Sequence, residues 1–205
     1  MKQPLPIRGA QKSVLFIALL YLGIYIPLAG VTYFPFWYET NCSFHNGCQR
    51  FGEEKAVQRI HELTAFMRHT GELIHEDWTQ KEKWHLAEVR LIFDKLFFAA
   101  LGAILVCLLL FHRDGLRQSS MANMVLIACC AGILPFFDYF WKDIFHEYLF
   151  DNTFWKNNAA DVSYYIMPRI FFKYTMMLII AAAMMLNTTV FLLTRSKGKS
   201  GPQGR

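Results

Sequence analysis

Two histidines, far apart along the chain, have the side chains best suited to acid–base chemistry. His85 lies in the segment KWHLAEVRLIF and His146 in the segment KDIFHEYLF. An imidazole has an unperturbed pKa near neutrality, so it can take up or release a proton at physiological pH. Glu88 follows His85 by three residues and shares its helix face, where a carboxylate can fix the tautomer of the ring. The pair suits general acid–base catalysis, whereas a single interfacial histidine is more often just polar surface.

Charged side chains near the same segments form a second group of candidates: Arg90, Asp94, Lys95, Asp138 and Lys173. They flank long apolar runs, where charges are expensive and usually face a bundle interior or a cavity. Structural anchoring and a polar pocket both explain them. Arg90 and Asp94 are four residues apart and are expected to pair.

Other reactive residue types give weaker signals. His61, His69 and His75 lack the carboxylate or cysteine spacing of a zinc site, and Cys42, His45 and Cys48 lack a strong fourth ligand. No metal site is therefore predicted. The sequence also has no serine elbow, phosphate loop or dinucleotide fingerprint.

Four long apolar runs must position these residues. Hydrophobic residues make up 54% of the 205 residues, above the share usual for a soluble domain. A bilayer core of about 30 Å needs roughly 20 helical residues, and backbone groups in lipid must satisfy one another. We therefore predict an all-α polytopic membrane protein, one domain over 1–194, whose spans cover about 13–36, 91–111, 119–140 and 171–194. The first run is too long for a cleaved signal peptide and is expected to stay attached.

The charges of the connecting segments predict the orientation. The two ends of the chain and the loop between spans two and three carry nine basic residues and one acid, or +8, whereas the other side sums to −3. Positive loops stay in the cytoplasm, so both termini are expected inside and segments 39–90 and 142–170 outside. The basic charge thus reflects topology and attraction to membrane phospholipid rather than nucleic-acid binding.

The outer segments are expected to form a helical cap. An amphipathic helix is predicted from about 53 to 68, and Thr79 with Glu82 resembles a capping box that opens a helix continuing into span two. Cys42 and Cys48 lie on the oxidising side and are predicted to form a disulfide. Aromatic residues at the outer ends of spans one and three fit an interfacial belt and also a vestibule for acyl chains. Residues 195–205 are predicted to be a disordered cytoplasmic tail.

Two motifs resemble a known family, the bacterial lipoprotein intramolecular transacylases. The first is WTQKEKWHLAEVRLIF, with a histidine, an acid three residues on, a valine and a basic residue. The second is FHEYLFDNTFWKNNAADVSYYIMPRIFF, in which the family pattern falls on His146, Phe150, Trp155, Asp161, Pro168, Phe171 and Phe172. Glu88 stands where the family is expected to have aspartate. Arg169 and Ile170 replace a more acidic stretch, and the 42–48 cysteine loop is not a family feature.

The resemblance implies a specific reaction in the bacterial cytoplasmic membrane, at its outer face. The sn-2 acyl chain of a diacylglyceryl-lipoprotein moves to the α-amino group of the same N-terminal cysteine, and no cofactor is needed. His85 and His146 would be the catalytic residues, with Glu88, Arg90, Trp155 and Asp161 as supporting or oxyanion-binding candidates. Two alternatives remain at this stage: a non-catalytic membrane protein that binds lipoprotein or lipid, and a thiol–disulfide membrane enzyme.

Overall fold

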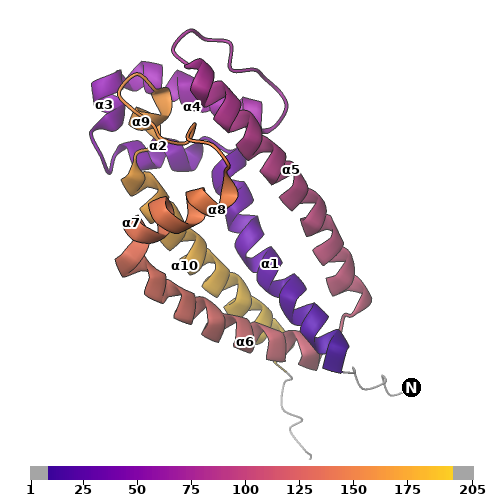
Figure 1. The fold of residues 1–205 in the computed structure, drawn as a ribbon. Helices are drawn as coiled ribbons and strands as arrows, with labels where there is room; N and C mark the ends of the chain where they lie inside the picture. The colour runs from indigo at the N-terminus through magenta and orange to yellow at the C-terminus, as the bar shows by residue number, and fades with distance from the viewer. Residues whose placement is uncertain (1–8, 196–205) are drawn as a thin grey trace, which may run out of the picture.

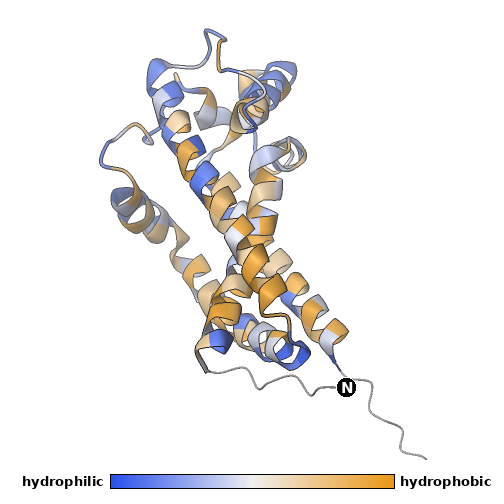
Figure 2. Cartoon of the chain, turned by 90° about the vertical axis from the view of Figure 1, so that its right-hand side faces the viewer, coloured by the Kyte–Doolittle hydropathy of each residue, from blue (hydrophilic) through white to orange (hydrophobic). Residues whose placement is uncertain are grey.

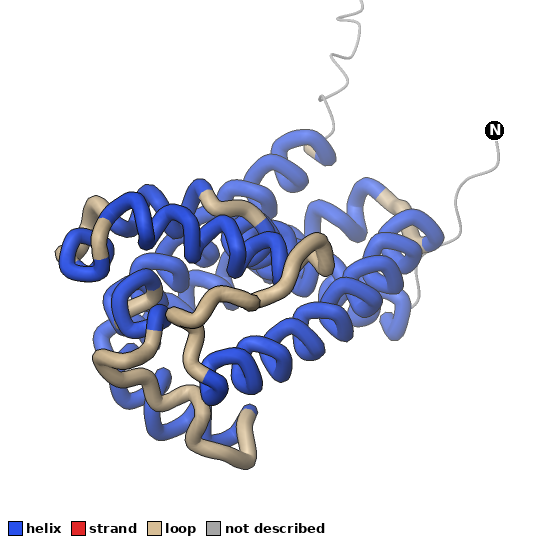
Figure 3. The backbone as a smooth tube through the Cα atoms, turned by 90° about the horizontal axis from the view of Figure 1, so that it is seen from above, coloured by secondary structure: helices blue, strands red, loops and turns tan. Residues whose placement is uncertain are grey.

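The protein is a bundle of long helices with a smaller helical cap at one end (Figure 1). This computed structural model describes residues 9–195, which contain helices and loops and no strand (Figure 3). Four helical segments are long and apolar enough to cross a membrane: α1 (Gly9–Tyr33), α5 (Gln80–Leu109), Arg113–Leu149 and α10 (Arg169–Thr194). The all-α, four-span membrane architecture predicted from the sequence is therefore confirmed. The predicted tail, except Arg195, lies outside the described residues.

Hydrophobic residues make up most of the bundle, and hydrophilic residues gather toward its two ends (Figure 2). Leu105, Leu108 and Val125 are more than half exposed in the isolated chain, as expected for side chains that face lipid rather than water. The described residues begin and end at the end of the bundle opposite the cap (Figure 1).

The helix α1 is the centre of the bundle, packing against α5, α6 (Arg113–Cys130) and α10. The contact between α6 and α10 is also extensive. It includes a buried amide pair, in which Asn123 Nδ2 donates to Asn187 Oδ1 over 3.3 Å. The Asn187 side chain fits because residue 23 is glycine: a Cβ there would lie 2.9 Å from Asn187 Nδ2. By contrast, α5 packs mainly on α1, which leaves its other face toward lipid.

The third span is not a regular α-helix. After α6 the chain continues as a 3₁₀ helix (η1, Ala131–Phe136), a single turn (α7, Phe137–Tyr139), a π-helix (η2, Phe140–His146) and another short turn (α8, Glu147–Leu149). Pro135 lies inside the 3₁₀ segment, where it cannot donate the backbone hydrogen bond of an α-helix. The π-helix widens the turn that ends at His146 and so changes where that side chain points.

The cap consists of α2 (Phe36–Cys42), α3 (Gly47–Phe51), α4 (Glu53–Met67) and α9 (Val162–Ile166). The amphipathic pattern places α4 correctly: Ile60, Leu63, Thr64 and Met67 are buried in the cap core, whereas Val57 is 40% exposed. The helix ends before Gly71, because His69 already adopts a positive φ of 59°. The helix α5 begins with the predicted capping box of Thr79 and Glu82 and continues into the second span.

A disulfide joins Cys42 and Cys48, whose Cα atoms are 5.6 Å apart, and it closes the loop between α2 and α3. This loop lies against α9. A Cβ on Gly47 would lie 2.3 Å from the carbonyl oxygen of Tyr165, so only glycine permits this approach. The Phe51 and Tyr165 rings stack at 5.2 Å. Because of these contacts, the short helix α9 is fixed in the cap.

Candidate active site

His85 lies in the second turn of α5, on the cap side of the apolar part of that helix. A helix of 30 residues is about 45 Å long, so it extends well beyond a hydrocarbon core of about 30 Å. The His85 side chain is only 15% exposed. Its ring contacts Phe150 edge to face, with centroids 4.7 Å apart. The imidazole is therefore enclosed near the boundary of the apolar region rather than displayed on the surface.

His146 closes the π-helix and is 6% exposed. Its Nδ1 lies 2.6 Å from the main-chain carbonyl oxygen of Trp141. A carbonyl only accepts hydrogen bonds, so Nδ1 must carry a hydrogen, and in the neutral ring Nε2 has the free lone pair. The ring lies between two indoles, with centroid distances of 4.6 Å to Trp141 and 4.5 Å to Trp155.

The two histidines are brought together by the ring of Phe150. This side chain contacts His85 at 4.7 Å and His146 at 5.9 Å, measured between ring centroids. Residues 61 positions apart in the chain thus share one site at the cap end of the bundle, as their predicted depth indicated.

Glu88 flanks His85, as expected, without forming a close hydrogen bond. Its Oε2 lies 3.7 Å from His85 Nδ1, and neither of these buried atoms has a hydrogen-bond partner. The other carboxylate oxygen accepts a 2.8 Å hydrogen bond from Asn152 Nδ2. Glu88 is therefore fixed by the loop after α8 and faces the imidazole across a short gap, which a small rotation would close.

Trp155 and Arg90 have different surroundings. The indole of Trp155 lies against His146, with Lys156 Nζ 4.9 Å from the same ring. Arg90 lies against the cap: its guanidinium carbon is 3.9 Å from the centroid of the Phe66 ring, and Nη1 donates to the Phe66 carbonyl over 3.3 Å. The expected pair of Arg90 with Asp94 is not formed, because Asp94 binds His69 Nε2 at 2.9 Å instead.

Asp161 supports the loop rather than contacting the imidazoles. It is 1% exposed and accepts hydrogen bonds from Lys81 Nζ (2.6 Å), the Asn158 N–H (2.7 Å) and the Thr79 hydroxyl (2.8 Å). Burial alone would raise the pKa of this carboxyl, but the hydrogen bonds and the Lys81 charge outweigh it and lower the pKa below its ordinary value of 3.8. Asp161 therefore stays ionised and ties the loop to α5.

Several residues of the site had no clear signal in the sequence. Trp141 reads as part of an interfacial aromatic belt, and only the π-helix turns its carbonyl toward His146. Asn152 reads as a turn residue. The buried contact of Glu82 with Ser163 joins positions 81 apart, which no local pattern predicts. Phe150 was indicated only by the family motif.

Three other outer histidines, His61, His69 and His75, form ion pairs with carboxylates instead. His61 Nε2 lies 3.0 Å from Glu39, and His75 Nδ1 lies 3.1 Å from Asp77. The His61 side chain is 58% exposed. Because Cys42 and Cys48 are joined in a disulfide, they are not available as thiolate ligands for a metal.

Comparison with known proteins gives a consistent result. Residues 12–172 match the model of the family described as lipoprotein intramolecular transacylase Lit. An in meso structure of the membrane-integral Lit from Bacillus cereus has a TM-score of 0.77 at 13% identity, covering 90% of this chain and 92% of the other. A variant of that protein with one mutated residue has a TM-score of 0.74 at 15% identity, covering 91% of each chain. A search of curated protein sequences found no significant match. The family match spans most of the sequence, and the chain therefore belongs to the lipoprotein intramolecular transacylases, a family of membrane-integral acyltransferases.

Proposed function

We propose that the protein moves the sn-2 acyl chain of a diacylglyceryl-lipoprotein to the α-amino group of its N-terminal cysteine, giving the lyso form. The observation that carries this proposal is the meeting of His85 and His146 around Phe150. Family membership supplies the reaction class, acyl transfer within a lipoprotein. The site residues and the direction of transfer are part of the proposal.

The reaction needs a base, an oxyanion donor and an acid. An α-amino group has a pKa of about 8, so it is mostly protonated at neutral pH and must lose a proton before it attacks. Attack of the amine nitrogen on the ester carbonyl forms the C–N bond and places a negative charge on the carbonyl oxygen. When the intermediate collapses, the C–O bond to glycerol breaks, and the alkoxide takes up a proton. No acyl donor from outside is required.

The imidazoles have the properties for both proton transfers. With Nδ1–H fixed on the Trp141 carbonyl, neutral His146 keeps an acceptor at Nε2, and protonated His146 becomes a donor there. His85 directs Nδ1 toward Glu88, whose carboxylate favours a proton at that nitrogen. One ring acts as base while the other donates to the oxyanion or the leaving oxygen. A single such donor typically contributes about 3 kcal/mol.

Trp155 is the better placed of the two proposed oxyanion helpers. Its indole lies against His146, and indole Nε1–H is a donor that cannot itself titrate. Arg90 is held against Phe66, so its part in the proposal is to stabilise the cap end of α5.

The substrate is proposed to enter from the outer leaflet of the bacterial cytoplasmic membrane. The +8 and −3 charge partition supports a cytoplasmic location for the uncapped end and, with it, a site at the outer face. Because α5 packs mainly on α1, a face of its apolar part that includes Phe98 and Leu105 stays exposed toward lipid beyond the site. Acyl chains can then stay in the bilayer while the head of the substrate reaches the histidines.

The alternatives have less support. A lipoprotein-binding scaffold has no need for two enclosed imidazoles at one place. A thiol–disulfide enzyme needs a second cysteine pair, but Cys107, Cys129 and Cys130 lie in the spanning helices as free thiols.

The test is reconstitution of the purified protein in proteoliposomes with a synthetic diacylglyceryl-lipopeptide. Half of the substrate carries a deuterated sn-2 chain and the other half a distinguishable peptide. Mass spectrometry is expected to show a product of unchanged mass, with one acyl group now resistant to alkaline hydrolysis and no exchange of label between peptides. Exchange of label would contradict an intramolecular transfer, and a product with a free α-amine would contradict the acceptor.

A further inference from the structure

The buried carboxylate of Glu82 has no part in the acid–base chemistry, yet it is among the most fully bonded groups of the protein. It is 1% exposed. Its Oε1 accepts from both the N–H (2.7 Å) and the hydroxyl (2.6 Å) of Ser163, and its Oε2 accepts from the Thr79 N–H at 3.0 Å. A buried charge is costly unless such hydrogen bonds compensate it. These hydrogen bonds therefore hold Ser163 at a fixed place against the helix α5.

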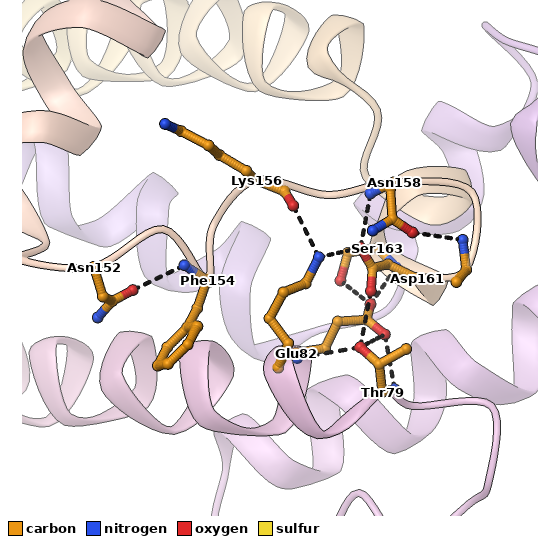
Figure 4. Close-up of polar contacts among 10 residues, drawn as sticks. Thr79, Glu82, Asn152, Phe154, Lys156, Asn158, Asp161 and Ser163 are labelled. Atoms are coloured by element: carbon orange, nitrogen blue, oxygen red, sulfur yellow. Dashed lines mark hydrogen bonds and ion pairs between the residues drawn. The ribbon is translucent and has the colours of Figure 1, made fainter.

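Residues 150–163, which we call the strap, lie along the first turns of α5 in the opposite chain direction (Figure 4). Ser163 contacts Glu82 at one end of the strap, and Phe154 stacks on Trp84 at 5.4 Å in the middle. Phe150 contacts His85 at the other end. The strap also supplies Trp155, whose ring lies on His146. Both imidazoles are thus packed against side chains of this one segment.

We propose that Glu82 and Ser163 are positioning residues that set the spacing of the two histidines by fixing the strap on α5. Glu82 and His85 are three residues apart and share a helix face, so Ser163 is bound to the same part of α5 that carries His85. A shift of the strap at Ser163 would therefore displace Phe150 relative to His85 and Trp155 relative to His146. The inference rests on the proposed function. Misplacement of reacting groups by about 1 Å can lower the rate on the order of 100-fold, so the Glu82–Ser163 contact should have a large effect on the reaction rate.

The first test is the variant Glu82→Gln. Glutamine keeps the size, but its amide nitrogen must face the donors of either Ser163 or Thr79, which breaks one set of bonds. We expect kcat to fall on the order of 100-fold. KM should remain nearly unchanged, because Glu82 is 1% exposed and does not face the substrate. Ser163→Ala keeps its N–H bond to Glu82 and should lose less. The double variant should be no slower than Glu82→Gln alone, since both act through one contact.

Glu62→Gln is the matched control. Glu62 is also a cap carboxylate with two partners, Arg59 Nη1 at 2.6 Å within α4 and Trp78 Nε1 at 2.9 Å, of which the second ties the 68–78 loop to α4. Its kcat per folded molecule should equal that of the wild type. Equal losses in the two variants would assign Glu82 a general role in cap stability and overturn the proposal, as would an unchanged kcat in Glu82→Gln.

A second readout does not depend on activity. In ¹⁵N-histidine NMR spectra, the imidazole signals of His85 and His146 should shift in Glu82→Gln and stay in place in Glu62→Gln. Unshifted signals in the folded Glu82→Gln protein would refute the positioning role. If the wild type forms no lyso product, the proposed reaction fails, and the NMR comparison alone then decides whether Glu82 and Ser163 set the histidine spacing.

Discussion

The two histidines are held in different ways. His85 lies on a regular helix whose start is fixed by buried, hydrogen-bonded carboxyl groups, above all those of Glu82 and Asp161. His146 lies at the end of an irregular segment, where aromatic rings surround it and one main-chain carbonyl orients it. The first support is electrostatic, and its strength depends on pH through the charge of Asp161. The second is largely apolar packing with one backbone hydrogen bond. Substitutions in the two supports should therefore have different effects.

Phe150→Ala should have the largest effect, because this ring contacts both imidazoles and is 9% exposed. Truncation of a buried phenylalanine costs about 3 kcal/mol or more and leaves a cavity. We expect a clear fall in melting temperature in detergent and near-complete loss of lyso-lipoprotein formation. Phe36→Ala, at a position 74% exposed, is the control. Normal activity in Phe150→Ala would mean that the ring does not set the site geometry.

The substitution Trp141→Ala removes aromatic packing around His146 and leaves its backbone hydrogen bond in place. The Trp141 indole stacks on Phe172 at 4.4 Å and on Phe145 at 4.9 Å, whereas the carbonyl that binds His146 belongs to the backbone and is retained. Because the side chain is only partly buried, we expect destabilisation of about 2 kcal/mol. Thermal melts at pH 7 should show this loss. An unchanged melting temperature would contradict an aromatic support.

Asp161→Asn breaks the polar support, and its effect should depend on pH. The pKa of Asp161 is lowered in the folded protein, so its ionisation stabilises the fold above the ordinary pKa of 3.8 and this contribution disappears as the pH falls through the folded value. The variant should melt at a lower temperature than the wild type at pH 7. The two curves should converge at acidic pH, which a series of thermal melts would show. Parallel curves would indicate that the charge of Asp161 is not what holds the strap.

The same contrast explains how much of the site the sequence could predict. Local rules placed the capping box of Thr79 and Glu82 and the helix α4, because these depend on neighbours within four residues. They did not predict that Arg90 would lie on Phe66 and Asp94 on His69. These contacts depend on how the cap folds over α5. The path of the strap has the same origin, since its bonds join residues about 80 positions apart.

The sequence indicated only part of the irregular third span that holds His146. Pro135 indicates a break in the third span, but proline alone does not specify a 3₁₀ helix followed by a π-helix. Aromatic residues in this stretch fit a membrane interface equally well, and Tyr139, at 63% exposure, fits that role. The sequence alone does not distinguish Tyr139 from Trp141. Only the tertiary packing shows that Trp141 lies against His146.

The most direct measurement is mass spectrometry of lipoprotein N-termini from cells that produce the wild type, His85→Ala, His146→Ala or His61→Ala at equal membrane levels. Both site variants should lose the lyso form while keeping their elution profile in detergent. His61→Ala should match the wild type, because that imidazole is exposed and paired with Glu39. Lyso-lipoprotein formed at the wild-type level by either site variant would contradict the two-histidine mechanism and leave lipoprotein binding as the better account.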